Sequence, residues 1–266
     1  MAEAGEAKAA GLYYELHGRD DAPPLILSSG LGGSASYWAP NLPAFAEHFR
    51  VIAYDHRGTG RSDRVLPDTV SVDDLADDIL ALMDALGIER AHLVGHAAGG
   101  VAGLALAHRA EARLSKLVVV NGWAKADPHF LRCFEARLNL LRHAGTEAFL
   151  RAQPIFLFPA EWISAHAAAL DAELAHQLVG FPGAATMEKR IAALAAFDAS
   201  PWVGTLATPT LAIASRDDML VPWTCTQDLA AANPHIRRSD MPWGGHACNV
   251  TDPATFDALV LDFLRS

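Results

Sequence analysis

The sequence is poor in positive charge, in cysteine and in long apolar segments. Its 21 Lys and Arg against 31 Asp and Glu give a net charge of −10, which argues against nucleic acid as a partner because phosphate binding requires a basic surface. The three cysteines, Cys133, Cys225 and Cys248, are too scattered for a disulfide framework or a paired-cysteine metal site. This usage indicates a reducing compartment.

The N-terminal stretch "MAEAGEAKAAG" also lacks a feature, namely the basic start and apolar segment of a secretory signal. No uncharged apolar run approaches the length that crosses a bilayer, so we expect no membrane partner. We predict a cytoplasmic protein that binds a small molecule and carries a short flexible leader before Gly11.

What is present is an alternation of strand-like and helical segments in 266 residues that are 51% hydrophobic. Helical spacing marks a segment that ends at Gly87, and a last helix is expected from Asp252, with Pro253 in its first turn. Strands are expected at residues 12–16, 24–29, 50–55, 91–95, 116–122, 208–215 and 235–240. The alternation predicts an α/β fold, with a mostly parallel sheet covered by helices on both faces.

The alternation of strand-like and helical segments stops between residues 124 and 200, where Ala- and Leu-rich helical segments are interrupted by prolines and glycines. This region contains no convincing strand. We predict that residues 124–200 form a helical lid, inserted into a single domain that spans residues 1–266.

The run "LVGHAAGG" at residues 93–100 leads from a predicted strand into a turn of small residues. It fits the GxSxG turn that presents a nucleophilic serine, except that the central position holds Ala97. A generic strand-to-helix junction is the alternative explanation, because glycines also serve close helix packing.

Two further loops carry acid and base side chains in the chain order that follows such a turn in hydrolases. Asp218, four residues before Pro222, is the candidate acid, and Asp217 is the neighbour that could be confused with it. His246 lies in the Gly-rich run "PWGGHACNVTDP" and is the candidate base. Either residue alone is more often an ordinary surface or core residue, and their order is what favours a catalytic pair.

The glycine loop that begins "SSGLGG" follows a strand and offers free backbone amides. In a hydrolase, the amides of Leu31 and Ala98 would form the oxyanion hole. A rival interpretation is a dinucleotide-binding GxGxxG/A motif, Gly30 to Ala35, with Asp55 as its ribose-binding acid.

The rival is disfavoured because that motif needs a long helix at once, whereas Pro40 and Pro43 fall in this region. The run "DHRGTGRSD" gives Asp55 a local role instead. We expect a buried ion-pair turn there, with Arg57 as the cationic partner.

Taken together, the runs "SGLGGSASYW", "YDHRGTG", "GHAAGG", "NGWAKADPHFLRCFEAR", "QPIFLFPAEW", "DDMLVP" and "GGHACNVTDP" resemble the α/β-hydrolases, and in particular the hydrolases of the Rut pathway of uracil degradation. The resemblance runs from about Pro24 to Leu264. It implies the α/β-hydrolase fold with a helical lid, hydrolysis of aminoacrylate or carbamate, no cofactor, and a homodimer. It also implies that an alanine at position 97 is natural to the family.

Without a serine, the expected chemistry is activation of water by His246, with Asp218 fixing the tautomer of the imidazole. Such help is worth about 10²–10⁴-fold, too little for an amide bond but enough for a labile substrate. Cys248 is expected to be an inert buried thiol. We predict no metal site.

The expected substrate is a small anion, which a cationic or aromatic side chain could bind. The candidates for binding it are Arg132 and Arg137 in the first lid helix and Trp38 near the glycine loop. For each arginine, an outward position in solvent is an alternative at least as good.

Three other functions remain open at this point. They are a cofactor-free His/Asp oxygenase, a non-catalytic binding protein on a hydrolase scaffold, and an esterase whose serine was exchanged for Ala97. The sequence does not separate carbamate from aminoacrylate as substrate.

Overall fold

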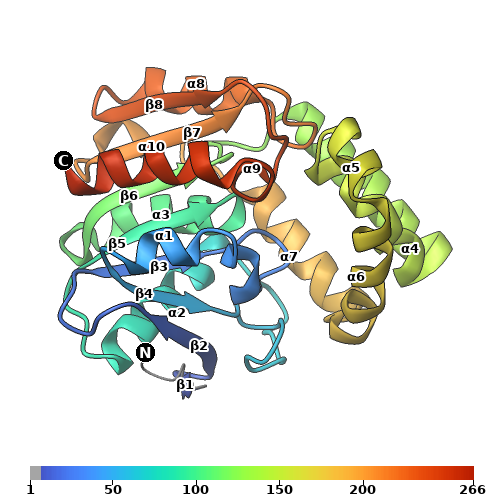
Figure 1. The fold of residues 1–266 in the computed structure, drawn as a ribbon, viewed down its shortest axis with the longest axis horizontal. Coiled ribbons are helices and arrows are strands. Elements are labelled where there is room, and N and C mark those ends of the chain that lie inside the picture. The colour runs from blue at the N-terminus through green and yellow to red at the C-terminus, as the bar shows by residue number, and fades with distance from the viewer. Residues whose placement is uncertain (1–6) are drawn as a thin grey trace.

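The computed structural model describes residues 7–266 and shows a twisted sheet of eight strands (Figure 1). The strand order is β1-β2-β4-β3-β5-β6-β7-β8, with β1 and β2 antiparallel to their neighbours and the other six strands parallel. The strands are β1 (Ala7–Ala9), β2 (Leu12–His17), β3 (Pro24–Ser28), β4 (Arg50–Tyr54), β5 (Ala91–His96), β6 (Leu114–Val120), β7 (Thr210–Ser215) and β8 (Ile236–Met241). The predicted α/β architecture and all seven predicted strands are confirmed.

The short strand β1 corrects the prediction of a flexible leader before Gly11. Residues Ala7–Ala9 pair with β2 through Ala7↔Tyr14 and Ala9↔Leu12, and Ala10 and Gly11, both with positive φ, make the tight turn between the two strands. The rest of the predicted leader, residues 1–6, lies outside the described residues.

Each face of the sheet carries its own apolar layer. On one face pack α2 (Val72–Ala85), α3 (Ala98–Arg109) and α8 (Trp223–Ala232). On the other face pack α1 (Leu42–Ala46), α9 (Cys248–Thr251) and α10 (Pro253–Arg265). The helix α2 begins with a complete capping box between Ser71 and Asp74, and α10 is capped by Asp252, as predicted.

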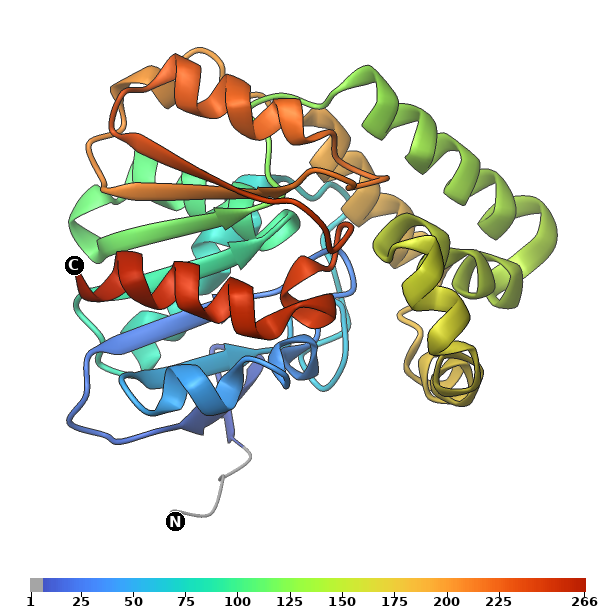
Figure 2. The same ribbon diagram turned by 45° about the horizontal axis from the view of Figure 1, so that its top comes forward.

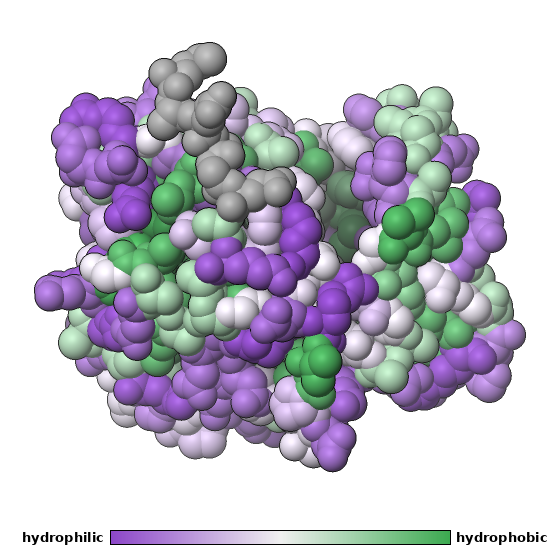
Figure 3. Space-filling view, turned by 90° about the horizontal axis from the view of Figure 1, so that it is seen from below, coloured by the Kyte–Doolittle hydropathy of each residue, from purple (hydrophilic) through white to green (hydrophobic). Residues whose placement is uncertain are grey.

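Residues between β6 and β7 form the helices α4 (Pro128–Leu157), α5 (Ala160–Ala165), α6 (Ala167–Gly180) and α7 (Ala184–Ala196). We call residues 124–200 the helical insertion. Figures 1 and 2 show α4, α5 and α6 standing away from the sheet, while α7 returns to it. Figure 3 shows a hollow between the two parts of the molecule, with hydrophobic residues in it.

The insertion leaves and rejoins the sheet at one place. Lys125 and Asp198 form an isolated antiparallel bridge there and also an ion pair of 2.9 Å, and the amide of Ala199 donates to the carbonyl of Ala124 at 2.7 Å. Met187, Ile191 and Leu194 of α7 belong to the apolar layer of α2 and α3, so α7 joins the insertion to the core.

The six parallel strands end at the same edge of the sheet, which determines where chemistry can occur. The glycine loop follows β3, the run with Ala97 follows β5, and the loops with Asp218 and His246 follow β7 and β8. All four loops therefore meet at this edge. Among residues 7–266, no helix is long and apolar enough to cross a membrane.

Candidate active site

The turn between β5 and α3 has the backbone of a nucleophile elbow, with a methyl group where a hydroxyl would be. Ala97 adopts φ 45° and ψ −102°, a conformation that an L-residue rarely takes. Its amide donates to the carbonyl of Val120 at 2.8 Å, and its own carbonyl accepts from Val101 at 2.9 Å to begin α3. Gly99 permits the turn, because a Cβ there would lie 2.2 Å from the carbonyl oxygen of Ser28.

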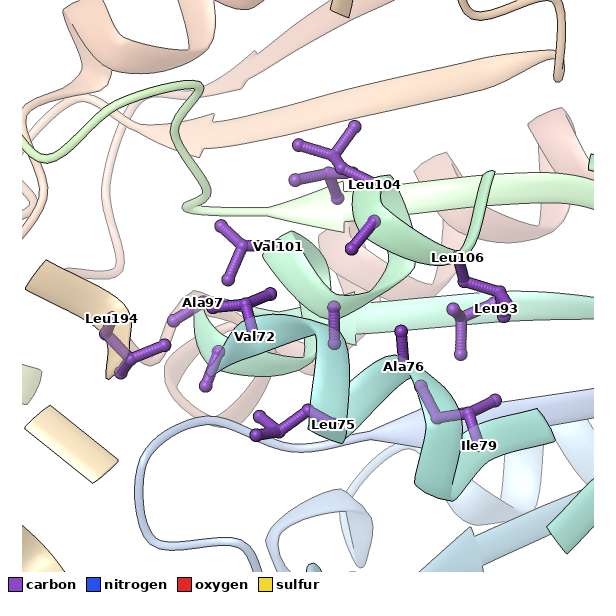
Figure 4. Packing of buried hydrophobic residues seen from close by; sticks show 14 of the residues in the cluster. Val72, Leu75, Ala76, Ile79, Leu93, Ala97, Val101, Leu104, Leu106 and Leu194 are labelled. Carbon is purple, nitrogen blue, oxygen red and sulfur yellow. The ribbon is translucent and has the colours of Figure 1, made fainter. Parts of the chain in front are cut away.

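Apolar side chains lie on one side of the methyl group of Ala97. Figure 4 shows Ala97 at the start of α3, with Val72 and Leu75 of α2 and Leu194 of α7 around it. All four belong to the same buried cluster.

The structure brings His246 and Asp218 together. Nδ1 of His246 donates to Oδ2 of Asp218 at 2.8 Å, and the exposed fractions of the two side chains are 3% and 0%. Oδ1 of Asp218 accepts from the amides of Leu220 at 2.7 Å and Val221 at 2.9 Å. Because both oxygens are held, the carboxylate is fixed and the proton of His246 stays on Nδ1, which leaves Nε2 as an acceptor.

Asp217, the alternative acid, has a different task. Its Oδ1 accepts from Oγ of Ser215 at 2.6 Å and from the amide of Gly245 at 2.9 Å. It therefore supports the loop that carries His246 and does not touch the imidazole by any hydrogen bond in the described residues.

Sequence reasoning missed His96, which directly precedes Ala97. Its Nε2 lies 2.8 Å from the carbonyl oxygen of His246, which also accepts from Nδ2 of Asn121 at 2.7 Å. A carbonyl only accepts, so Nε2 of His96 carries the hydrogen. Burial, and then the neighbouring charge of His246, hold the pKa of His96 well below its ordinary value, so it is neutral and orients the backbone of His246.

The two expected oxyanion donors come from the residue after Ala97 and from the glycine loop. Within the described chain, neither the amide of Leu31 nor that of Ala98 has a hydrogen-bond acceptor. The glycine loop approaches the elbow closely, since a Cβ on Gly30 would lie 3.9 Å from the methyl carbon of Ala97. Free amides at these two positions are consistent with the predicted oxyanion hole.

Arg137 is a buried cation with no anionic partner. Its side chain lies among Phe134, Phe149 and Phe156, with the guanidinium carbon 5.0–5.5 Å from the ring centroids, and it is 3% exposed. Nη2 donates to Oε1 of Gln153 at 3.3 Å, and no carboxylate of residues 7–266 pairs with it. Burial lowers the pKa of Arg137 to about 10, so it remains charged at neutral pH.

The surroundings of the other two candidates for substrate binding, Arg132 and Trp38, do not support these predictions. Arg132 is exposed on α4 and reaches only the carbonyl of Pro128 at 3.5 Å, because its position on the helix faces solvent. Trp38 is fully buried and packs against Phe256 of α10, in the apolar layer of the opposite face.

The neighbour of Trp38 is the residue that reaches the site. The ring of Tyr37 lies 4.9 Å from that of His96, and its hydroxyl donates to Oδ1 of Asn249 at 2.7 Å. Cys248 is fully buried beside it, and burial raises the pKa of its thiol to about 12, which agrees with the inert thiol that was predicted.

The glycine loop does not continue into the long helix that a dinucleotide site needs. Only a four-residue 3-10 helix follows, Ala35–Trp38, whose first amide donates to Oδ1 of Asp55 at 2.8 Å. Asp55 is buried and forms an ion pair in this turn, but its partner is the exposed Arg61 at 2.9 Å, whereas Arg57 pairs with Asp78. The predicted partner, Arg57, was therefore wrong.

No three histidine, cysteine or acidic side chains converge as a metal site within residues 7–266.

Comparisons with known proteins agree with this geometry. A family model described as the alpha/beta hydrolase fold matches residues 23–253. A protein of Caulobacter sp. (strain K31), named "Putative carbamate hydrolase RutD", is 54% identical over 256 residues, or 96% of each chain. A protein of the same name from Serratia proteamaculans is 47% identical and covers 95% of this chain and 96% of its own.

Solved structures give the same result. A hydrolase from Pseudomonas aeruginosa PA01 has a TM-score of 0.88 at 28% identity and covers 100% of this chain and 99% of its own. The enol-lactonase from Burkholderia xenovorans LB400 also has a TM-score of 0.88 at 28% identity, with 98% and 100% covered. The chain belongs to the α/β-hydrolase family and, within it, to the family of the RutD proteins.

Proposed function

We propose that this protein hydrolyses carbamate or 3-aminoacrylate with release of ammonia, as a step of uracil catabolism, by activating water without a covalent intermediate. The observation that carries the proposal is the His246–Asp218 pair of 2.8 Å beside an elbow that holds Ala97. The names of the relatives, which state carbamate hydrolase, supply the substrate class.

The space over Ala97 is where a water molecule takes the place of the missing hydroxyl. Nε2 of His246 removes a proton from that water, and Asp218 stabilises the imidazolium that forms. The amides of Leu31 and Ala98 bind the oxygen on which negative charge develops. General acid-base catalysis contributes about 10²–10⁴-fold, and an oxyanion donor adds about 3 kcal/mol.

Both substrates react with this machinery in balanced steps. The imine tautomer of 3-aminoacrylate takes up water at its C=N carbon to give a carbinolamine, which loses ammonia and leaves an aldehyde. Carbamate takes up the activated water at its carbon, His246 delivers the proton of that water to nitrogen, and the C–N bond breaks to give ammonia and bicarbonate. Both compounds decay in water unaided, so a modest acceleration suffices.

Arg137 binds the carboxylate of the substrate. A buried guanidinium without an acidic partner costs stability, and an anion entering the site compensates that charge. On α4, Cys133 lies one turn and His129 two turns before Arg137, and both contact the carbonyl of Met219, the residue after Asp218. That Arg137 lies one turn beyond a contact with the loop of Asp218 supports this role.

The test is ammonia release from freshly generated carbamate or 3-aminoacrylate by wild type, by His246→Ala and by a reaction without enzyme. We expect wild type to exceed the uncatalysed rate by 10²-fold or more, on the scale of general acid-base catalysis, and His246→Ala to lose most of that excess. His176→Ala, at an exposed histidine of α6, is the matched control and retains it. Equal rates for wild type and His246→Ala would refute the proposal.

A further inference from the structure

Arg190 of α7 is a second buried arginine, and all its hydrogen-bond partners lie near the glycine loop. Nε and Nη2 donate to the carbonyl oxygen of Leu31 at 3.2 and 3.0 Å, and Nη1 donates to the carbonyl of Arg57 at 3.3 Å. Nη2 also lies 3.0 Å from Nδ1 of His56. The side chain is 3% exposed, and no carboxylate of the described chain forms an ion pair with it.

The two peptide planes that flank Leu31 are held in different ways, and Arg190 holds one of them. The plane before Leu31 is held because the carbonyl of Gly30 accepts from the amide of Gly33 at 3.0 Å. Among residues 7–266, only Arg190 holds the plane after it, through the Leu31 carbonyl. The free N–H of Leu31 lies in the first of these planes. Because Arg190 holds the second plane, Leu31 cannot rotate within the turn, and the direction of its N–H is retained.

A buried network orients the guanidinium in turn. Arginine only donates, so Nδ1 of His56 accepts from Arg190 and Nε2 of His56 donates to Oγ of Ser28 at 3.1 Å. Burial, and then the charge of Arg190, hold the pKa of His56 well below its ordinary value, which keeps it neutral. The amide of His56 also donates to the carbonyl of Gly33 at 2.7 Å, so His56 holds the far end of the same turn.

We propose that Arg190 is a positioning residue that aims the Leu31 amide at the oxyanion, and that the helical insertion thereby completes the site. This inference rests on the proposed function for its kinetic consequence. The alternative is that Arg190 only attaches α7 to the sheet. If Arg190 only attaches α7, its loss should lower the stability of the fold and leave kcat unchanged. If Arg190 positions Leu31, its loss should lower kcat.

The variants Arg190→Lys and Arg190→Met separate these roles. A lysine cannot bridge the carbonyls of Leu31 and Arg57 and the ring of His56 at once. The matched control is Arg142→Met, because Arg142 also lies in the insertion but pairs with Glu188 at an exposed site.

For both Arg190 variants we expect kcat to fall about 10- to 10²-fold, less than the full loss of an oxyanion donor, with KM within about threefold. Hydrogen exchange of the peptide that covers residues 29–38 should accelerate, and Arg142→Met should change neither quantity. Methylguanidinium should restore part of kcat in Arg190→Met, because Arg190 lines a cavity of about 200 Å³ that also borders Tyr54 and His56.

Unchanged kcat, or a rise in KM alone, would overturn the inference even if wild type is active. If wild type proves inactive, the proposed function fails while hydrogen exchange still decides about Arg190, since unchanged exchange in residues 29–38 contradicts its role. If Arg190→Met does not fold, Arg190→Lys gives the same two readouts.

Discussion

Replacing Asp218 by asparagine should abolish the base without dismantling the site. The amides of Leu220 and Val221 require an oxygen at the Oδ1 position, so the new NH₂ group must occupy the position of Oδ2 and face His246. Nδ1 of His246 must then accept, which moves its hydrogen to Nε2. An imidazole in that tautomer cannot remove a proton from water.

The expected fall in kcat is about 10²–10⁴-fold, the whole contribution of general base catalysis, or about 3–5 kcal/mol. Stability should change far less. The three hydrogen bonds lose their charge assistance but not their geometry, which costs about 1–2 kcal/mol and lowers Tm by a few degrees in a chain of this size.

The assay is ammonia release corrected for spontaneous decay, together with thermal unfolding. Asp217→Asn is the matched control, because its retained oxygen still accepts from Ser215 and Gly245, and we expect less than a tenfold change in kcat. A similar loss in both variants would mean that support of the loop, and not the tautomer of His246, determines the rate. An unchanged rate in Asp218→Asn would contradict the mechanism outright.

Three further predictions follow from single side chains. Ala97→Gly should leave the free energy of unfolding unchanged or raised, because relief of about 1–3 kcal/mol of backbone strain offsets the entropy of glycine. Ala102→Gly within α3 should lower the free energy of unfolding by about 1 kcal/mol or more, and chemical denaturation measures both. Arg137→Met should raise KM at least about tenfold without lowering Tm, whereas the exposed Arg132→Met should leave KM unchanged, and equal KM values would contradict a role in substrate binding. Burial raises the pKa of Asp257 to about 6, so the folded state binds the extra proton and stability falls as pH rises from about 4 to about 6. Asp257→Asn should therefore be more stable than wild type above pH 6 by roughly 1–3 kcal/mol, with the gain disappearing below pH 4, as urea unfolding at several pH values would show.

The sequence was sufficient for the architecture because strands and helices have distinct apolar periods, and because parallel strands end at one edge. Because their loops end at that edge, the pairing of Asp218 with His246, 28 positions apart, could be predicted from the sequence alone. The strand Ala7–Ala9 escaped prediction because three residues carry no period, and its order depends on pairing with β2.

The roles of His96 and Arg190 could not be predicted for a different reason. Their partners are mainly backbone carbonyls of residues 150 and 159 positions away, and no side-chain pattern encodes such contacts. The same limit explains why the acidic turn was expected to use Arg57, whereas Arg61 has the reach to bind Asp55 with two nitrogens.

The joined ends of the helical insertion have a consequence for protein engineering. Because Lys125 and Asp198 are bridged side by side, the stretch between them begins and ends at the same place beside the sheet. A foreign segment with equally close ends could be transplanted there while the path of β6 and β7 stays as it is. Such a chimera would keep His246 and Asp218 but would lose Arg137 and Arg190, because the native segment carries both arginines.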